Sequence, residues 1–412
     1  MAAPHPPASD APAAPLAWAL AIHGGAGVVD AADGDPACSV VALRRGLRGM
    51  RRALRAGALV LAAGGSSLDA TCAAVARLED DPRFNAGRGS VLTRSGRYEL
   101  EASVMVCEQP PPRGGEPVPL AHADGGDGSG ALRCGAAALL TRAKNPVRVA
   151  RLVMERAPHT FLAGAEAEAF CERELGAGAL LPTEAEAGAY FGTEARHAQW
   201  RRWRAASEAE AGAGAGPACA ARPDDIAQQR GDAAGGSGGG GLGTVGAVAV
   251  DDRGALASAT STGGRVGKWD GRVGDTPVIG AGGWADRRVA VSGTGVGEAF
   301  ARRCAAKEVA ARVEHAGATL SEAAEAVVFR SLAPGDGGVV CVGRAGEVAM
   351  PFNTPGMWRG AADALGRFEV GVFGPMEAAA AAAAADGEGG GWRWEREVSD
   401  DTDASEEEGD GK

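Results

Sequence analysis

Thr244 is the residue whose position in this 412-residue chain best suits a chemical role. A glycine-rich run, GGSGGGGLG (235–243), ends at Gly243, and the strand-like TVGAVAV begins at Thr244. A threonine hydroxyl inside a chain is a poor nucleophile, but cleavage of the Gly243–Thr244 bond would give Thr244 an α-amine with a pKa of about 7.7–8.0. That amine could act as the base for the hydroxyl on the same residue. On this stretch alone, the simpler interpretation is a β-branched residue that starts a strand after a linker.

Several other catalytic and cofactor-binding patterns are absent from the sequence. No GxSxG nucleophile elbow is present, and the six histidines show no HExxH or similar metal spacing. The string SGTGVGEAF (292–300) has the glycines of a loose dinucleotide pattern, but no acidic residue follows at the distance of a Rossmann unit. The eight cysteines include no CxxC pair, which indicates reduced thiols rather than a zinc ribbon or a disulfide scaffold.

The charge and the terminal segments narrow the class of protein further. A formal net charge of −11 argues against nucleic acid as the main partner. The first fifteen residues form a proline-alanine arm without a basic n-region, and no apolar run approaches the length of a membrane span. We therefore expect a cytoplasmic protein without a membrane partner, with import into an organelle left open.

Periodicity predicts the elements that must hold Thr244 in place. Helices are expected at about 40–61, at 66–80 with Ser66 or Ser67 as cap, and at 145–158 entered through Asn145-Pro146. Non-periodic or low-complexity segments predict a surface insertion at 108–131, a flexible linker at about 207–241 and a tail outside the fold. The remaining predictions are a strand at 16–22, two strands about the turn RSGR within 90–106, strands at 244–250 and 255–261, helices at 297–317 and 320–332, and a strand pair at 337–353.

Seven motifs in a fixed order resemble the plant-type asparaginase/isoaspartyl peptidase family of N-terminal-nucleophile hydrolases. They are spread from about Leu16 to Pro375. This resemblance implies an α+β fold, a four-layer αββα sandwich, and a precursor that cuts itself so that Thr244 becomes a new N-terminus and the nucleophile. The motifs are IHGGAG (22–27), LDATCAAVARLEDDPRFNAGRGSVLTRSGRYELEASVM (68–105), NPVRVARLVMERAPHTFLAG (145–164), GTVGAVAVDDRGALASATSTGG (243–264), GRVGDTPVIGAGGWAD (271–286), SGTGVGE (292–298) and MPFNTPGMWRG (350–360).

The same resemblance assigns roles to residues around the nucleophile. Thr262 would hydrogen-bond and tune Thr244, and Asn85 would help to position it. Thr294 and Gly295 would form the oxyanion hole, in which one donor contributes about 3–4 kcal/mol. Each of these residues also has a plain structural interpretation, as a strand end or a turn.

Arg272 and Asp275 match the family residues that bind a free amino-acid head group. Arginine can hold the α-carboxylate with two hydrogen bonds, and aspartate can accept from the α-ammonium. Taken alone, this pair is more simply interpreted as a surface ion pair. His23, in the glycine loop HGGAG, is interpreted as a packed histidine at a strand end.

LEDDPRFNAG (78–87) resembles the family's sodium-binding loop, in which main-chain carbonyls hold the ion. A structural Na⁺ is thereby implied and no organic cofactor, and carbonyl oxygens suit such a hard cation. Leu242-Gly243 precedes the cleavage point, where the family has charged and histidine residues, so the speed of self-cleavage is open. The implied ligands are the backbone carbonyls of Leu78, Glu79, Asp81, Phe84, Ala86 and Arg88.

The domain organisation follows from the implied cleavage. We expect a disordered arm at 1–15, an α subunit at 16–243 that ends in the linker at about 207–243, a β subunit core at 244–376, and a disordered alanine-rich and acidic tail at 377–412. The implied substrates are isoaspartyl dipeptides and L-asparagine, and the implied assembly is a dimer of cleaved αβ heterodimers. The alternatives are an amidase acting on glycosylated asparagine, a protease resembling threonine aspartase, and an uncleaved paralogue that serves as a binding module.

Overall fold

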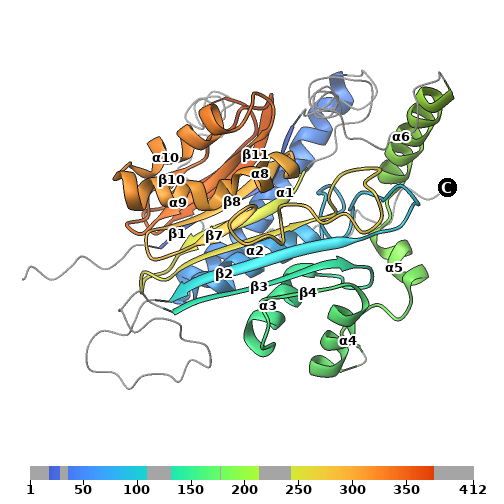
Figure 1. The fold of residues 1–412 in the computed structure, drawn as a ribbon. Helices are drawn as coiled ribbons and strands as arrows, with labels where there is room; N and C mark the ends of the chain where they lie inside the picture. The colour runs from blue at the N-terminus through green and yellow to red at the C-terminus, as the bar shows by residue number, and fades with distance from the viewer. Residues whose placement is uncertain (1–17, 28–35, 109–130, 177, 213–242, 375–412) are drawn as a thin grey trace, which may run out of the picture.

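A computed structural model describes residues 18–27, 36–108, 131–176, 178–212 and 243–374 (Figure 1). In this part of the chain, the larger sheet has the strand order β12-β11-β1-β5-β6-β2-β3-β4 and the smaller sheet has the order β10-β9-β8-β7. The strands are β1 Ala19–Gly27, β2 Leu100–Glu108, β3 Ala131–Leu140, β4 Phe161–Ala163, β5 Val245–Val250, β6 Leu256–Thr262, β7 Gly283–Ala285, β8 Val289–Gly295, β9 Gly337–Gly343, β10 Val348–Ala349, β11 Gly356–Asp363 and β12 Phe368–Gly371.

Helices α1, α2 and α3 pack on the large sheet and α9 and α10 pack on the small sheet. Figure 1 shows α9 and α10 beside the small sheet, at the opposite end of the molecule from α3 and α4. None of the helices in the described ranges is long and apolar enough to cross a membrane. The helices are α1 Pro36–Ala62, α2 Ser67–Glu79, α3 Pro146–Arg156, α4 Gly164–Leu175, α5 Glu184–Phe191, α6 Glu194–Gly212, α8 Gly297–Arg303, α9 Ala305–Ala316 and α10 Leu320–Ala326, followed by the π-helical turn η2 Val327–Ser331.

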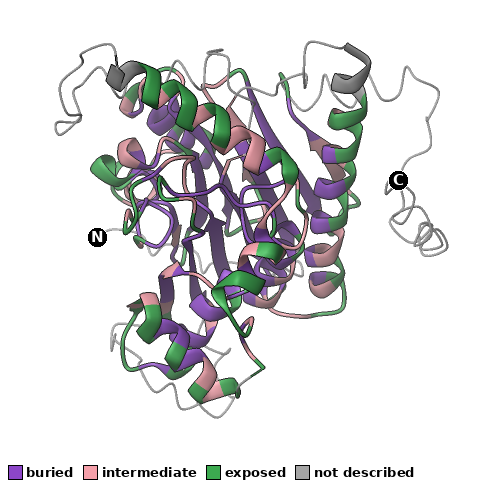
Figure 2. Cartoon of the chain, turned by 90° about the vertical axis from the view of Figure 1, so that its right-hand side faces the viewer, coloured by how far each residue is buried: buried purple, intermediate pink, exposed green. Residues whose placement is uncertain are grey.

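Both faces of the central strands are buried, which explains why these strands read as continuous apolar runs. In β1, Leu20 and Ile22 pack against α1 and α2, while Ala19 and Ala21 belong to a cluster that the small sheet shares. In β9, Val340 packs into this same cluster between the sheets, and its neighbours face α9 and α10. Figure 2 shows the result, with buried residues along the strands and the inner sides of the helices.

Most of the expected elements are confirmed. The helix expected at about 40–61 lies within α1, and α2 begins after Ser66, whose side chain accepts from the Asp69 N–H. α3 starts at Pro146, and β5 and β6 form the expected hairpin. The predicted segments 1–15, 109–130 of the insertion, 213–242 of the linker and 377–412 lie outside the described residues.

Three expectations about secondary structure are wrong. The segment 90–99 contains turns and an isolated bridge at Thr93 instead of a strand, so only β2 follows RSGR. The single helix expected at 297–317 is two helices, because Cys304 adopts a left-handed conformation with φ 49. The linker expected from about 207 begins later, since α6 continues to Gly212.

Candidate active site

Thr244 immediately precedes β5, where its hydroxyl faces that of Thr262. Because β5 and β6 pair antiparallel with Val245 opposite Ser261, the residue before Val245 comes beside the residue after Ser261. Thr244 Oγ1 donates to Thr262 Oγ1 at 3.3 Å, and both residues are buried. The structure therefore brings the predicted nucleophile and the predicted tuning hydroxyl into hydrogen-bond contact.

Asn85 holds the strap of chain that follows Thr262. Its side-chain Nδ2 donates to the Gly264 carbonyl at 2.7 Å. Its main-chain carbonyl accepts from the Gly263 N–H at 3.0 Å and from Thr262 Oγ1 at 3.4 Å. The Thr262 hydroxyl also accepts from the Gly264 N–H at 3.0 Å. Asn85 thus reaches Thr244 through Thr262, which makes it a positioning residue in this geometry.

The predicted cleavage bond lies between the glycine loop of β1 and Thr294. The Ala26 N–H donates to Thr294 Oγ1 at 3.3 Å, and a Cβ added to Gly243 would stand 3.2 Å from the same oxygen. Gly25 has φ +117, and a Cβ there would stand 2.1 Å from the Gly243 nitrogen. Only glycine allows the loop to approach the cleavage bond this closely.

His23 is a packed, fully buried residue of β1, as expected, and it also contacts Thr244, the predicted nucleophile. Its Nδ1 lies 2.9 Å from the Thr244 carbonyl and its Nε2 lies 2.8 Å from Ser292 Oγ. Ser292 Oγ also lies 2.8 Å from Thr260 Oγ1, and all these groups are buried. Burial lowers the pKa of His23 to about 3, so the ring is neutral at neutral pH.

The neutral ring fixes the direction of every hydrogen bond in the run that joins Thr244, His23, Ser292 and Thr260. The Thr244 carbonyl can only accept, so Nδ1 carries the proton and Nε2 is the acceptor. Ser292 must then donate its only hydroxyl proton to Nε2, and Thr260 must donate to Ser292. These three hydrogen bonds together hold the Thr244 carbonyl in one orientation.

Arg272 is held by Glu298 and lies close to the segment that follows Thr262. Its Nε and Nη2 donate to Glu298 Oε1 at 3.1 and 2.9 Å. A Cβ on Gly264, the residue whose N–H donates to Thr262, would stand 3.3 Å from Arg272 Nη1. The guanidinium therefore lies beside the strap that follows Thr262.

Two glycines after Thr294 leave space for the rest of the site. A Cβ on Gly295, which has φ +145, would stand 1.9 Å from the Asp336 carbonyl oxygen. A Cβ on Gly297 would stand 2.6 Å from Asp275 Oδ1 and 2.8 Å from Arg272 Nη2. The two Gly297 contacts place the Arg272 and Asp275 side chains together at the start of α8, three residues after Thr294.

Asp275 is a buried carboxyl in acidic surroundings. Burial, and then the nearby Glu101 carboxylate, raise its pKa to about 7, although Arg272 opposes this shift. The free site therefore disfavours the ionised form of Asp275, and a cationic group bound beside it would favour that form.

The predicted sodium loop is closed by its own backbone hydrogen bonds. Three of its six predicted carbonyls already accept backbone N–H groups: that of Leu78 from Asp80 and, at 3.3 Å, from Asp81, that of Glu79 from Arg88 at 2.7 Å, and that of Asp81 from Phe84 at 3.2 Å. A carbonyl oxygen has two lone pairs, so the Glu79 and Asp81 carbonyls each keep one that could face an ion. Among the described residues, no three His, Cys, Asp or Glu side chains gather as a metal site.

Sequence reasoning assigned no role to four charged or small residues of this site. Glu298 and Gly297 stand inside the quoted motif SGTGVGE, Glu101 stands inside the quoted motif at 68–105, and Lys268 stands between the motifs at 243–264 and 271–286. Glu298 and Glu101 lie 2.9 and 4.0 Å from Arg272 nitrogens. A buried arginine needs acidic partners, so an arginine predicted to lie in the site already indicates that acidic residues surround it. The sequence does not reveal which acids these are.

Comparison with known proteins agrees with this geometry. The sequence profile of a family described as asparaginase matches residues 16–110 and 126–372. The chain belongs to the asparaginase family. The match omits 111–125, which lies within the predicted insertion.

Curated relatives cover most of the chain. An isoaspartyl peptidase of Salmonella typhimurium is 38% identical over 343 residues, 82% of this chain and 93% of the relative. A probable isoaspartyl peptidase/L-asparaginase 2 of Arabidopsis thaliana is 35% identical over 366 residues, 86% of this chain and 99% of the relative. An isoaspartyl peptidase/L-asparaginase of Mus musculus is 38% identical over 345 residues, 82% of this chain and 89% of the relative.

Proposed function

We propose that the protein is a threonine-type hydrolase that releases L-aspartate from isoaspartyl dipeptides and from L-asparagine. The names of the similar proteins support this substrate class. The observation that carries the proposal is the position of Thr244, which pairs its hydroxyl with Thr262 at 3.3 Å directly after Gly243. We assign the two stacked sheets and their outer helices to the four-layer αββα sandwich of N-terminal-nucleophile hydrolases, with 16–243 and 244–376 as the two subunits of one domain.

Self-cleavage at Gly243–Thr244 creates the catalytic amine. The Thr244 hydroxyl attacks the Gly243 carbonyl carbon, the peptide C–N bond breaks, and the Gly243 acyl group moves to Oγ as an ester. Water then hydrolyses this ester, which gives a Gly243 carboxylate and the free amine and hydroxyl of Thr244. The close approach of Gly25 and Thr294 to Gly243 supports this site as the reacting bond.

Hydrolysis follows in two steps. The neutral α-amine of Thr244 takes the Oγ proton, and Oγ attacks the side-chain amide carbonyl of the substrate to form a β-aspartyl ester. The proton passes to the leaving amine or ammonia, and water releases aspartate in the second step. Thr294 Oγ1 accepts from Ala26 N–H and so keeps its own proton as a donor to the developing oxyanion, together with the Gly295 N–H.

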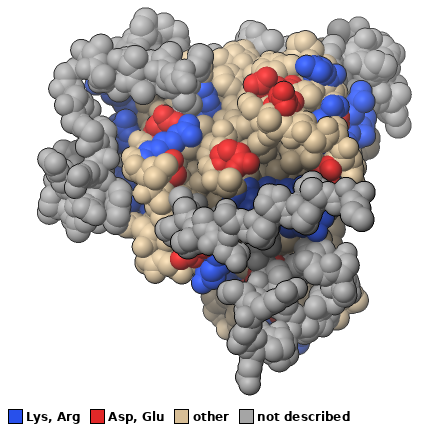
Figure 3. All heavy atoms as spheres, turned by 90° about the vertical axis from the view of Figure 1, so that its left-hand side faces the viewer, with Lys and Arg blue, Asp and Glu red and all other residues tan. Residues whose placement is uncertain are grey.

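The substrate head group is held by opposite charges. Arg272 binds the α-carboxylate and Asp275 accepts from the α-ammonium, and Gly297 leaves space for both side chains. On the face drawn in Figure 3, acidic and basic side chains are interspersed among neutral ones, which accords with a small-molecule substrate rather than a polyanion.

Three further assignments complete the proposal. The carbonyls of the 78–88 loop bind a structural Na⁺, which would stiffen the segment that carries Asn85. The cleaved protein forms a dimer of αβ heterodimers, and it is located in the cytoplasm. Cys72, Cys134, Cys171, Cys304 and Cys341 are free thiols, which accords with that location.

A denaturing gel tests the central proposal. Purified protein should separate into two fragments, and N-terminal sequencing of the smaller one should read TVGAV. Thr244→Ala should give one full-length band and no aspartate release. Thr183→Ala, which removes the side-chain cap of α5 and none of the contacts described for the site, should cleave like the wild type. A single wild-type band after prolonged incubation would refute the proposal.

A further inference from the structure

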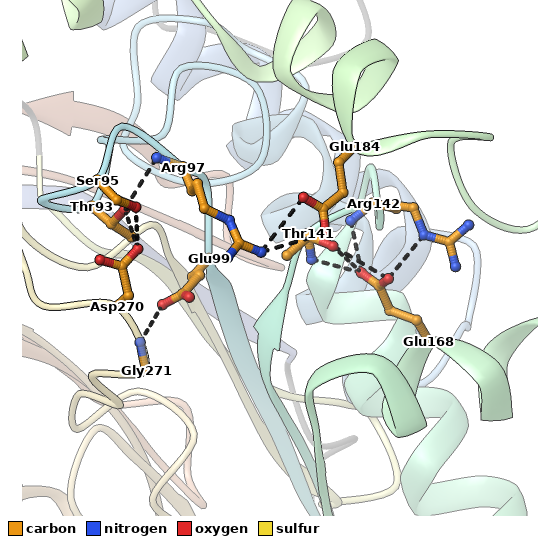
Figure 4. Close-up of polar contacts among 10 residues, drawn as sticks. All are labelled: Thr93, Ser95, Arg97, Glu99, Thr141, Arg142, Glu168, Glu184, Asp270 and Gly271. Atoms are coloured by element: carbon orange, nitrogen blue, oxygen red, sulfur yellow. Dashed lines mark hydrogen bonds and ion pairs between the residues drawn. The ribbon is translucent and has the colours of Figure 1, made fainter.

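Two glutamates before and within β2 hold the loop that carries Arg272. Glu101 Oε1 and Oε2 accept from the Gly274 N–H at 3.1 and 3.0 Å. Glu99 Oε2 accepts from the Gly271 N–H at 2.8 Å, and Figure 4 shows this second contact. Gly271 and Gly274 bracket Arg272 in the chain. The two carboxylates therefore fix the backbone on both sides of the arginine.

The spacing of the glutamates explains how they reach one loop. Successive side chains of extended chain point to opposite faces, so Glu99 and Glu101 point to the same side. Leu100, which lies between them, points to the other side and packs in a hydrophobic cluster with Tyr98 and Phe191. Both glutamates are buried, and Glu101 is 1% exposed. Each of these buried carboxylates accepts a hydrogen bond from a backbone N–H of the 271–274 loop, so both are committed to that loop.

Charge balance links the same glutamates to the guanidinium. Glu101 Oε1 lies 4.0 Å from Arg272 Nη1, on the opposite side from the Glu298 contacts of Nε and Nη2. Lys268 Nζ is buried and donates to the Glu99 carbonyl at 2.5 Å. Burial raises the pKa of Glu101, and the charge of Lys268 opposes this shift. The arginine thus has an acidic partner on each side.

The loop is tied to the same region at a third point. Asp270 Oδ1 accepts from Thr93 Oγ1 at 2.9 Å and also from Ser95. Figure 4 shows these contacts next to the Glu99–Gly271 contact. Residues 93–101 therefore form a continuous support beneath the segment that precedes Arg272.

We propose that Glu99 and Glu101 are positioning residues that orient Arg272 to bind the α-carboxylate of the substrate. This inference rests on the proposed function, because it assigns them to head-group binding rather than to bond cleavage. Such binding is equally strong in the ground state and the transition state, so its loss raises KM while kcat stays nearly constant. Self-cleavage needs no head group, so its rate should also stay constant.

The test compares Glu101→Gln with a matched buried glutamate. Glu168 also accepts two backbone N–H groups and pairs with Arg142, but it lies on α4 (Figure 4). We expect Glu101→Gln to raise KM for an isoaspartyl dipeptide by about 10- to 100-fold, the effect of weakening charged hydrogen bonds. Glu168→Gln should leave KM within twofold, and Glu101→Asp should retain part of the affinity.

Competitive inhibitors separate positioning from general damage to the fold. L-aspartate carries an α-carboxylate, and 3-aminopropanoate is the same molecule without it. The wild type should prefer aspartate strongly, and Glu101→Gln should reduce this preference by about tenfold or more. If Glu101→Gln fails to fold, Glu99→Gln, which weakens a single contact with Gly271, should show the same loss of preference to a smaller degree.

The outcomes distinguish this inference from the proposed function. Wild-type protein that neither cleaves itself nor releases aspartate would refute the proposed function. An active wild type whose KM and inhibitor preference are unchanged in both Glu101→Gln and Glu99→Gln would overturn the inference alone. Loss of self-cleavage in folded Glu101→Gln would also overturn it, since the residue would then act at the cleavage site.

Discussion

Removal of the Ser292 hydroxyl should disturb both the stability and the chemistry of the site. Ser292 joins Thr260 to His23 Nε2 through two hydrogen bonds of 2.8 Å, and His23 holds the Thr244 carbonyl at 2.9 Å. Ser292→Ala leaves the Thr260 hydroxyl and His23 Nε2 without a partner. Each buried orphan costs about 1–3 kcal/mol, so the free energy of unfolding should fall by about 2–6 kcal/mol.

The chemical effect follows from the orientation of His23. Ser292 donates to Nε2 and thereby fixes the ring, whose Nδ1–H binds the Thr244 carbonyl. Without Ser292, Nε2 has no anchor, so the ring can rotate and its Nδ1–H no longer holds the Thr244 carbonyl in one orientation. We expect kcat for an isoaspartyl dipeptide to fall by about tenfold, corresponding to about 1.4 kcal/mol of misplaced nucleophile.

The two effects are measured on different backgrounds. Unfolding by urea is measured in the Thr244→Ala protein, whose uncleaved chain avoids the irreversible separation of subunits. Rates are measured in the self-cleaving protein. Ser258→Ala is the matched control, because Ser258 Oγ donates to the Val291 carbonyl at 2.8 Å in the same layer without touching His23. It should lower stability and leave kcat unchanged.

Two results would refute this reasoning. A change of less than about 0.5 kcal/mol in Ser292→Ala would mean that the orphaned groups find other partners. An equal loss of kcat in Ser258→Ala and Ser292→Ala would mean that activity follows general stability rather than the orientation of Thr244.

Three further predictions concern the loops around the site. Because a bound ammonium favours ionised Asp275, whose pKa in the free site is raised to about 7, inhibition by L-aspartate should weaken as pH falls below 7. Inhibition by succinate, which lacks the ammonium, should not show this limb, and Asp275→Asn should abolish it. Gly25→Ala places a Cβ 2.1 Å from the Gly243 nitrogen and should slow self-cleavage on a gel time course by at least tenfold. Gly297→Ala places a Cβ 2.8 Å from Arg272 Nη2 and should raise KM while self-cleavage, measured on the same gels, proceeds normally; an unchanged KM would count against head-group binding by Arg272.

Local sequence signals predicted the elements near Thr244 because each carries its own pattern. The cap at Ser66, the proline that starts α3 and the turn at 251–254 are features of a few adjacent residues. The strand expected before RSGR failed for the converse reason. Residues 90–99 are drawn into contacts with 268–271, far away in sequence, and those contacts replace a local strand.

The residues around the site divide in the same way. Thr244, Thr262, Arg272 and Asp275 stand in motifs whose resemblance to a family could be stated from the sequence. Their partners were not predictable by pattern. His23 reaches Ser292 across 269 positions, and Glu101 reaches Gly274 across 173. Such pairs are set by sheet register and loop packing, which no window of sequence contains.

The register of the sheets explains why the proposed nucleophile is the residue just before a strand. On the face toward the small sheet, β1 runs from Ala19 and Ala21 to His23, and β6 runs from Leu256 to Thr260 and Thr262. Both strands therefore become polar toward their C-terminal ends, and β5 is antiparallel to both. The end of β5 that meets these polar groups is its N-terminal end, where Thr244 stands. A slip of β6 by one residue would turn Thr260 and Thr262 toward the helices and orphan His23 and Thr244 together. This register therefore brings the buried hydroxyls and the proposed new chain end at Thr244 into one site.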